Sequence, residues 1–184
     1  GEVRVAHLSP DTPAVNVNFA PVGDPLVEII AGLTYPNLAP PQGSSGAYLP
    51  VPTGAYQVRV DAPSLGSAGT GAISGVLNLD GNVSYTIAAV GTLGSLLTPE
   101  PATAPLQALL LEDDRAIAPG QAKIRFVHAS ANTPAVDIVL DSDGVEAPGD
   151  PTLFGNVARF ASGRYITVPA GTYQLDAFLN DRSI

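Results

Sequence analysis

Hydrophobic and polar residues alternate along most of this chain, and a period of two is typical of β-strands that bury one face. One run, 'LVEIIAGL' (26–33), leaves helix and strand open. Pro-Thr-Gly (52–54) and Pro-Ala-Gly (169–171) have the chemistry of tight turns. The pattern predicts roughly five to seven short strands in the first part of the chain. Its clearest strand-like runs are 'VRVAHL' (3–8), 'AVNVNFA' (14–20), 'AYQVRVDA' (55–62), 'VSYTIAAVG' (83–91) and 'LQALLLE' (106–112).

Two segments of the chain recur in the same order. 'RVAHLSPDTPAVNVNF' (4–19) returns as 'RFVHASANTPAVDIVL' (125–140), and 'YLPVPTGAYQVRVDA' (48–62) returns as 'YITVPAGTYQLDAF' (165–178). Two paired blocks in one order predict two homologous domains. The residues of the first block that align are His7 with His128, Ser9 with Ser130, and Thr12 with Thr133.

Short strands separated by Pro and Gly turns favour an all-β fold, with two tandem Greek-key β-sandwich domains of the immunoglobulin-like or transthyretin-like type. We predict a first domain over residues 1–114, a short linker over 115–121, and a second domain over 122–184. The first copy continues after 'QVRVDA' through further strand-like runs that have no counterpart in the second. The second domain is therefore predicted to be incomplete at its C-terminal end.

Two interpretations of the incomplete domain stay open. The chain is either a fragment of a longer protein, or the missing strands are supplied by a neighbouring subunit, as in donor-strand complementation. The second alternative would produce head-to-tail filaments, because the contact joins two different surfaces.

Composition narrows the classes of function. The 184 residues carry a formal net charge of −9, which disfavours binding to nucleic acid or to anionic lipid. No apolar run approaches the roughly 20 residues that span a bilayer, so we expect no membrane insertion in this segment. There is no Cys and no Met, and the chain opens directly in a strand-like pattern. We therefore expect a mature exported product, secreted or displayed at the cell surface.

The paired motifs resemble the DUF4397 family, a domain of unknown function found in exported bacterial and archaeal proteins, often in tandem. The resemblance rests on 'RVAHLSPDTPAVNVNF' and 'RFVHASANTPAVDIVL', each followed by 'VPTGAYQVRV' or 'VPAGTYQLDA'. It implies a β-sandwich at the cell surface or outside the cell. It supplies no catalytic residues.

The two histidines invite a hydrolase hypothesis, since Ser and Asp residues lie near each. The copies disagree, however, because Asp11 aligns with Asn132 and Asn16 aligns with Asp137. A structural turn is the preferred interpretation, in which the histidine and the hydroxyls bond the backbone of a Ser-x-x-Thr-Pro turn. That turn motif consists of His7, Ser9, Thr12, His128, Ser130 and Thr133.

Two further candidate sites rest on weaker patterns. 'DSDGVEAPGD' (141–150) offers carboxylates that could bind Ca²⁺, although an Asp-Gly turn explains the same letters. Asn82 begins an N-glycosylation pattern between two predicted strands. The possible calcium ligands are Asp141, Asp143, Glu146 and Asp150.

Tyrosines recur in both copies, and we expect their rings to pack in the core rather than to bind sugars. These are Tyr48, Tyr56, Tyr165 and Tyr173.

Together these features predict a non-enzymatic structural or adhesive protein of the cell surface that needs no cofactor, apart from the possible calcium. Self-association into a homopolymer, or binding to other surface proteins, would be its mode of action. A glycan- or protein-binding module is the first alternative, and a hydrolase using the repeated histidine is the second.

Overall fold

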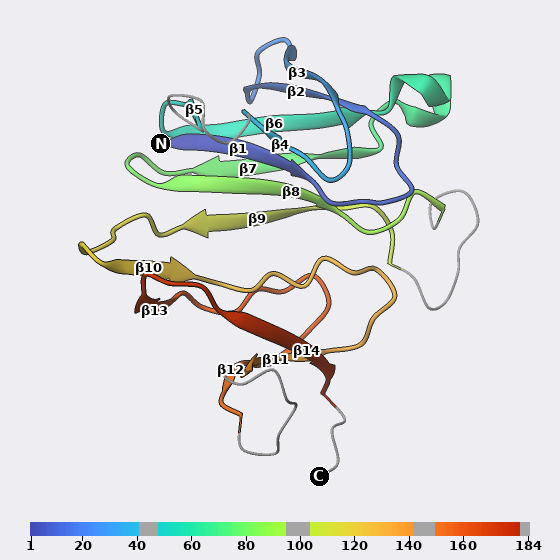
Figure 1. Ribbon diagram of the computed structural model, residues 1–184. Helices are drawn as coiled ribbons and strands as arrows, with labels where there is room; N and C mark the ends of the chain where they lie inside the picture. Colours follow the sequence, from blue (N-terminus) through green and yellow to red (C-terminus); the bar gives the residue numbers. More distant parts are fainter. Residues whose placement is uncertain (41–47, 95–103, 142–149, 181–184) are drawn as a thin grey trace. The chain divides into compact units, whose positions relative to one another are not determined.

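The computed structural model describes residues 1–40, 48–94, 104–141 and 150–180, and it divides into two compact units, residues 1–113 and 114–184. The division lies next to the predicted boundary at residue 114. The predicted linker, 115–121, falls inside the second unit, where Gln121 already pairs with Pro169. Figure 1 colours the first unit from blue to olive and the second from yellow to red.

The first unit is a sandwich of two sheets, and the chain crosses from one sheet to the other several times. One sheet has the order β4-β1-β8-β9, with β5 also paired to β1, and the other has the order β3-β2-β6-β7. The all-β prediction is confirmed, and the ambiguous run 'LVEIIAGL' forms a strand. The strands are β1 (Glu2–His7), β2 (Val15–Pro21), β3 (Val27–Leu33), β4 (Leu38–Ala39), β5 (Leu49–Pro50), β6 (Gly54–Asp61), β7 (Ile73–Leu79), β8 (Ser84–Val90) and β9 (Gln107–Asp113), and a 3₁₀ segment covers Pro63–Gly69.

The core of this unit lies between the two sheets and follows the alternation in the sequence. Along β6, Tyr56, Val58 and Val60 are each at most 5% exposed, whereas the residues between them reach the outer face. Phe19 of β2 stacks on Tyr56, with the ring centroids 4.6 Å apart. Burial of such apolar side chains is the main contribution to the stability of a small sandwich.

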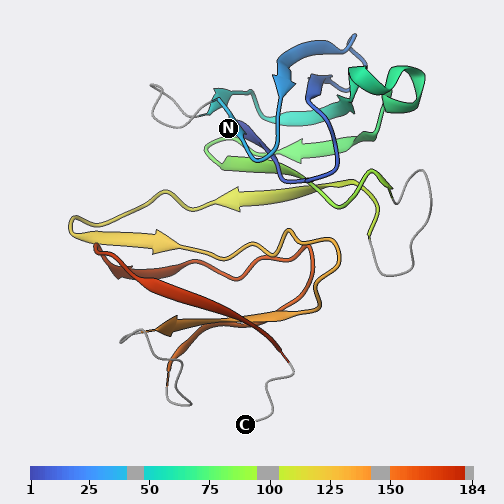
Figure 2. The ribbon, with the colours of Figure 1, turned by 45° about the vertical axis from the view of Figure 1, so that its right-hand side comes forward.

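Among the paired strands that the structure describes, one pair is parallel. The first strand, β1, runs parallel to β8, with Val3 opposite Tyr85 and His7 opposite Ala89. Its other edge pairs antiparallel with β4 and β5. Parallel neighbours need a long connection, and here the whole β2–β7 segment supplies it. Figure 2 shows β1 and β8 in the same sheet of the first unit.

The second unit repeats three of these pairings, those of β1 with β5, β2 with β3 and β2 with β6, and it has fewer strands. Ile124 pairs with Ile166 as its counterpart Val3 pairs with Leu49. One sheet has the order β10-β13 and the other β12-β11-β14. The strands are β10 (Gln121–Ile124), β11 (Val136–Asp141), β12 (Thr152–Val157), β13 (Ile166–Pro169) and β14 (Gln174–Leu179), which correspond to β1, β2, β3, β5 and β6.

The core of the second unit is small. Its buried cluster consists of Val136, Ile138, Phe154 and Val157, with partly buried side chains packed around it. Among the described residues, β14 is the last strand, and counterparts of β7, β8 and β9 do not follow it.

Replacement of a core residue should distinguish the sandwich interior from its edge. Leu79 is 1% exposed and belongs to the core of the first unit, whereas Val76 is 59% exposed. We expect Leu79→Ala to lower the free energy of unfolding by about 2–5 kcal/mol, because it leaves a cavity. Val76→Ala should change it by no more than about 0.5 kcal/mol. Urea denaturation followed by circular dichroism measures both, and equal losses would contradict the assignment of the core.

Candidate functional site

The first histidine is the centre of a buried turn. His7 ends β1 and is 0% exposed. Its Nε2 bonds the carbonyl oxygen of Pro13 at 3.1 Å, and Nδ1 accepts the backbone N–H of Ser9 at 3.4 Å. A carbonyl only accepts and a backbone N–H only donates, so the ring proton lies on Nε2. Both ring nitrogens therefore hold backbone groups.

The hydroxyls of the motif bond to each other rather than to the histidine. Ser9 Oγ lies 2.7 Å from Thr12 Oγ1 and donates to Asp11 Oδ1 at 3.2 Å. Ser9 is 0% exposed and Thr12 is 5% exposed. This short network closes the loop between β1 and β2, which joins the two sheets of the sandwich.

The second unit contains the same turn. His128 is 4% exposed, and its Nε2 lies 2.8 Å from the carbonyl oxygen of Pro134, the counterpart of Pro13. Ser130 Oγ lies 2.6 Å from Thr133 Oγ1 and donates to Asn132 Oδ1 at 3.2 Å. The structure thus brings all six motif residues into two equivalent turns, three in each.

The nearby acids have separate partners in the backbone. Asp11 accepts the N–H groups of Leu93 and Gly94, both at 2.9 Å. Asp137 accepts the N–H of Asn156 at 2.6 Å, at a bulge between β11 and β12. Neither carboxylate bonds to a histidine in these contacts. The side chains around each histidine are thus arranged as a hydrogen-bonded turn.

Hydrogen bonding shifts the titration of Asp11. Partial burial raises the pKa of this carboxyl, but the N–H donors of Gly94 and Leu93 and the hydroxyl of Ser9 outweigh that effect. The net result is a pKa below the ordinary value of 3.8. The carboxylate form thus ties the turn to the segment that follows β8.

The predicted calcium ligands are only partly within the described residues. Asp143 and Glu146 lie outside them. Asp141 is 5% exposed and accepts the side-chain amide of Gln174 at 2.7 Å. The part of the chain that the structure describes has no group of three or more metal-binding side chains. The calcium site stays a prediction.

Asn82 lies in the turn between β7 and β8 and is exposed, with a left-handed backbone (φ 64°). The asparagine side chain of the glycosylation pattern is therefore accessible. Whether it is modified stays a prediction.

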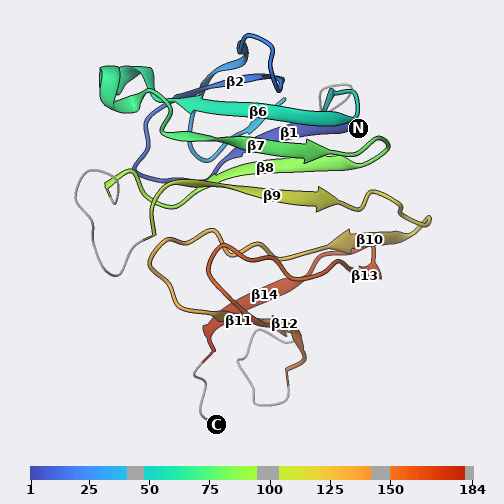
Figure 3. The same cartoon turned by 180° about the vertical axis from the view of Figure 1, so that it is seen from behind.

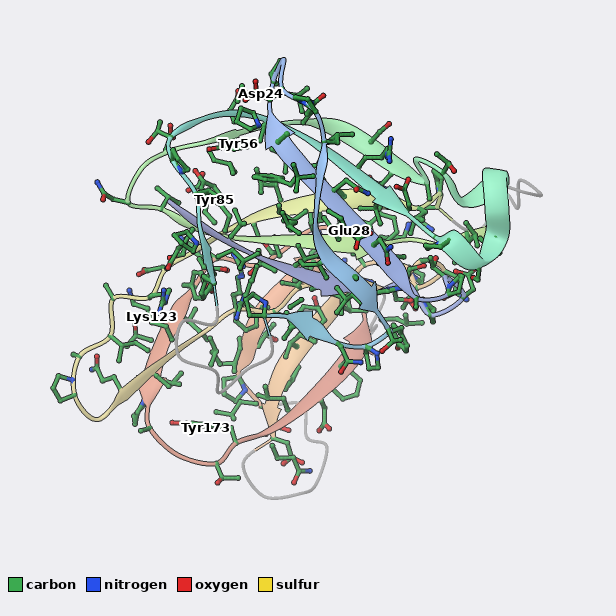
Figure 4. The ribbon with its side chains drawn as sticks, turned by 90° about the horizontal axis from the view of Figure 1, so that it is seen from above. Asp24, Glu28, Tyr56, Tyr85, Lys123 and Tyr173 are labelled. Carbon is green, nitrogen blue, oxygen red and sulfur yellow. The ribbon has the colours of Figure 1, made fainter. Side chains whose placement is uncertain are left out.

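The repeated tyrosines have structural contacts. Tyr56 donates to the carbonyl oxygen of Pro52 at 3.0 Å, and Tyr173 donates to that of Pro169 at 2.7 Å. Both tyrosines are labelled in Figure 4. Tyr48 and Tyr165 each lie under an arginine, Arg4 and Arg125 respectively, at 4.9 and 4.8 Å from guanidinium carbon to ring centroid.

A buried polar cluster on the first sheet was missed by the sequence analysis. Asp113 of β9 is 8% exposed and accepts the hydroxyls of Tyr48, at 2.8 Å, and Thr86, at 2.5 Å. Arg4 lies 3.6 Å from the same carboxylate. These residues are far apart in sequence, and only the recurrence of Arg and Tyr in both copies hinted at part of the cluster.

A cleft of mixed polarity opens along one side of the first unit. It lies between β7 and β9, has a volume of about 450 Å³, and is lined by Val58, Ile73, Gly75, Leu106 and Ala108 among others. Figure 3 shows both strands. The lining residues include no aromatic ring on which a sugar could stack.

The most unusual surface of the second unit lies on β14. Leu175 and Leu179 are 44% and 47% exposed, whereas their counterparts Val58, in β6, and Ala62, directly after it, are 4% and 0% exposed. Register places Leu179 beside Val136 of the buried cluster, so these leucines lie on the core side of the sheet. We call the core side of β14, formed by Leu175, Ala177 and Leu179, the open face.

Comparison with protein families agrees with these features. A family model described as "Domain of unknown function (DUF4397)" matches residues 1–139. The chain belongs to the DUF4397 family. The match covers the first unit and both histidine turns, and it ends inside β11.

No curated protein sequence matches this DUF4397 chain. Within the described residues, none of the helical structure is long and apolar enough to cross a membrane.

Replacement of the buried serine tests how much the turn contributes to the stability of this DUF4397 chain. We expect Ser9→Ala to lower the free energy of unfolding of the first unit by about 1–3 kcal/mol, because Thr12 Oγ1 loses its buried partner. Ser130→Ala is the matched variant, and it should cost less because Ser130 is only partly buried. Urea denaturation provides the comparison. A negligible effect at Ser9 would contradict a structural role.

The lowered pKa of Asp11 predicts a dependence of stability on pH. A carboxyl whose pKa is lower in the folded state contributes stability above its unfolded pKa, and that contribution is lost as the pH falls through the folded value. The difference in Tm between the wild type and Asp11→Asn should therefore be largest above about pH 4 and should shrink toward about pH 2. Calorimetry at several pH values measures it. A difference that is constant across this range would show that the charge plays no part.

Proposed function

We propose that this protein is a non-enzymatic structural module of the cell surface or extracellular space, and that it assembles with further copies through strand pairing on its second unit. The open face of β14 carries the proposal. An apolar sheet face that its own unit leaves uncovered is typical of a surface that another polypeptide completes.

Comparison of the two units supports this interpretation. The strand β6 pairs with β2 at one edge and with β7 at the other, and its apolar side chains are buried. The corresponding strand β14 pairs with β11 at one edge, and the described residues provide no strand at the other. The unpaired edge offers backbone hydrogen bonds to an added strand in the same sheet, and the leucines offer apolar area to a strand that lies across the core from β14.

The geometry of the histidine turns supports a role without catalysis. A catalytic base needs a ring nitrogen within reach of a nucleophile. In the first turn, both nitrogens of His7 are engaged with backbone groups, and the hydroxyl of Ser9 bonds to Thr12 and Asp11. The extracellular location is part of the proposal and follows from the family resemblance.

Removal of the apolar side chains tests assembly. We expect the 184-residue chain to form concentration-dependent polymers, and Leu175→Ser combined with Leu179→Ser to abolish them. Both side chains are already exposed, so the double variant should change the stability of the separate chain by no more than about 0.5 kcal/mol per site. Sedimentation velocity and negative-stain microscopy measure assembly.

A matched control removes equally exposed apolar side chains elsewhere. Val22 and Val27 are 55% and 60% exposed in the first unit, and Val22→Ser with Val27→Ser should assemble as the wild type does. A wild-type chain that is monomeric up to its solubility limit would overturn the proposal. Equal loss of assembly in both double variants would also overturn it, because the contact would then not be specific to β14.

A further inference from the structure

The first unit shows which strand covers the face that is open in the second. A small gap in its core is lined by Val58 and Val60 of β6 together with Ile87 and Ala89 of β8. The strand β8 therefore lies across the core from β6. Tyr56 of β6 and Tyr85 of β8 are labelled in Figure 4. In the second unit, β14 occupies the place of β6.

The edge of β10 marks where such a strand would pair. In the first unit, β1 has β5 on one side and β8 on the other. In the second unit, β13 occupies the place of β5, and the described residues place no strand on the side that corresponds to β8. β1 extends from Glu2 to His7, whereas β10 ends at Ile124. In the ladder with β8, β1 is paired as far as His7, where Ala89 is its partner.

A hollow lies at the end of the same face. Pro134, Ala135, Leu179 and Asn180 line a cleft of about 250 Å³. In the first unit the corresponding turn is bonded to the segment after β8, through Asp11 and the N–H groups of Leu93 and Gly94. The open face, the edge of β10 and the hollow therefore lie at the positions that β8 and the residues after it occupy in the first unit.

We propose that the second unit binds an extended strand whose inward side chains are apolar, as those of β8 are. The strand would lie between β10 and β14 and run parallel to β10. We call this place the acceptor groove; it is bounded by β10, by the open face and by the hollow at Pro134. This inference rests on the proposed function in one respect, which is that the strand comes from a second copy of the chain.

The first unit also defines what the inserted strand must contain. Its inward positions should be apolar, as Tyr85, Ile87 and Ala89 are in β8. Its register follows from β1, in which Ala6 is opposite Ala88. Val127 is the counterpart of Ala6, so the residue of the inserted strand that aligns with Ala88 should lie next to Val127. At the position of Thr86, a hydroxyl would lie near Arg125, as Thr86 Oγ1 accepts from Arg4 at 2.7 Å.

Disulfide trapping tests both the groove and its register. The chain contains no Cys, so Val127→Cys introduces a single thiol. The probe is a peptide of residues 83–94 with Cys in place of residue 84, 86, 88 or 90. We expect trapping by the 88 peptide to be at least about tenfold faster than by the 84 and 90 peptides, because a parallel strand places only that residue beside Val127. A maximum at 84 or 90, or equal rates for all four, would overturn the proposed register.

Variants of the open face separate the groove from non-specific capture. Adding Leu175→Asp and Leu179→Asp to Val127→Cys should slow trapping by at least about tenfold, because the peptide then loses its apolar contacts. Val22→Asp with Val27→Asp in the same background is the control and should leave the rate unchanged. Register-specific trapping by a chain that never polymerises would overturn the proposed function and leave the groove in place. Polymers that form without register-specific trapping would overturn the groove.

Discussion

Coverage of the core side of the β2–β6 sheet is the constraint on which each unit depends. In the first unit, the strand parallel to β1 provides that coverage, and Tyr85, Ile87 and Ala89 complete a continuous core. The second unit has the same first strand, the same turn and the same sheet edge, but its buried cluster stops at four residues. The difference in burial between β6 and β14 follows from a layer of strands that the described residues provide in the first unit and not in the second. It does not follow from the composition of β14, which is at least as apolar.

The histidine turn has a separate task, which is to connect the two sheets. In both units it holds the loop between the first and second strands by the same bonds, from the histidine to a proline carbonyl and between a serine and a threonine hydroxyl. These groups are polar and buried, so each must keep a partner. Because the bond from histidine to the proline carbonyl and the bond between the hydroxyls form in both units, they do not require the strands that, among the described residues, only the first unit has.

Alternation, turn chemistry and the internal repeat were sufficient to predict the all-β class and the presence of strands from 'VRVAHL' onward. They could not predict that β1 and β8 are parallel, because pairing direction depends on residues far apart in the chain. The cluster around Asp113 escaped prediction for the same reason, since Arg4, Thr86 and Asp113 meet only after the sheet has formed. Exposure of Leu175 and Leu179 could be expected only in outline, from strands that have no counterpart in the second copy.

The disagreement between the copies now has a physical reason at both positions. Asn16 and Asp137 each present a side-chain oxygen to a backbone N–H, that of Gly32 and that of Asn156, at matching bulges. An amide oxygen and a carboxylate oxygen can each accept this single N–H, so the position tolerates either residue. Asp11 differs, because it accepts two N–H groups from the segment after β8, and a carboxylate binds two donors more strongly than an amide oxygen does. Asn132 occupies this position in the unit whose described residues provide no such segment. The exchange of acid and amide that argued against a catalytic triad thus follows the fold, because the stronger acceptor is present where the turn holds a neighbouring strand in place.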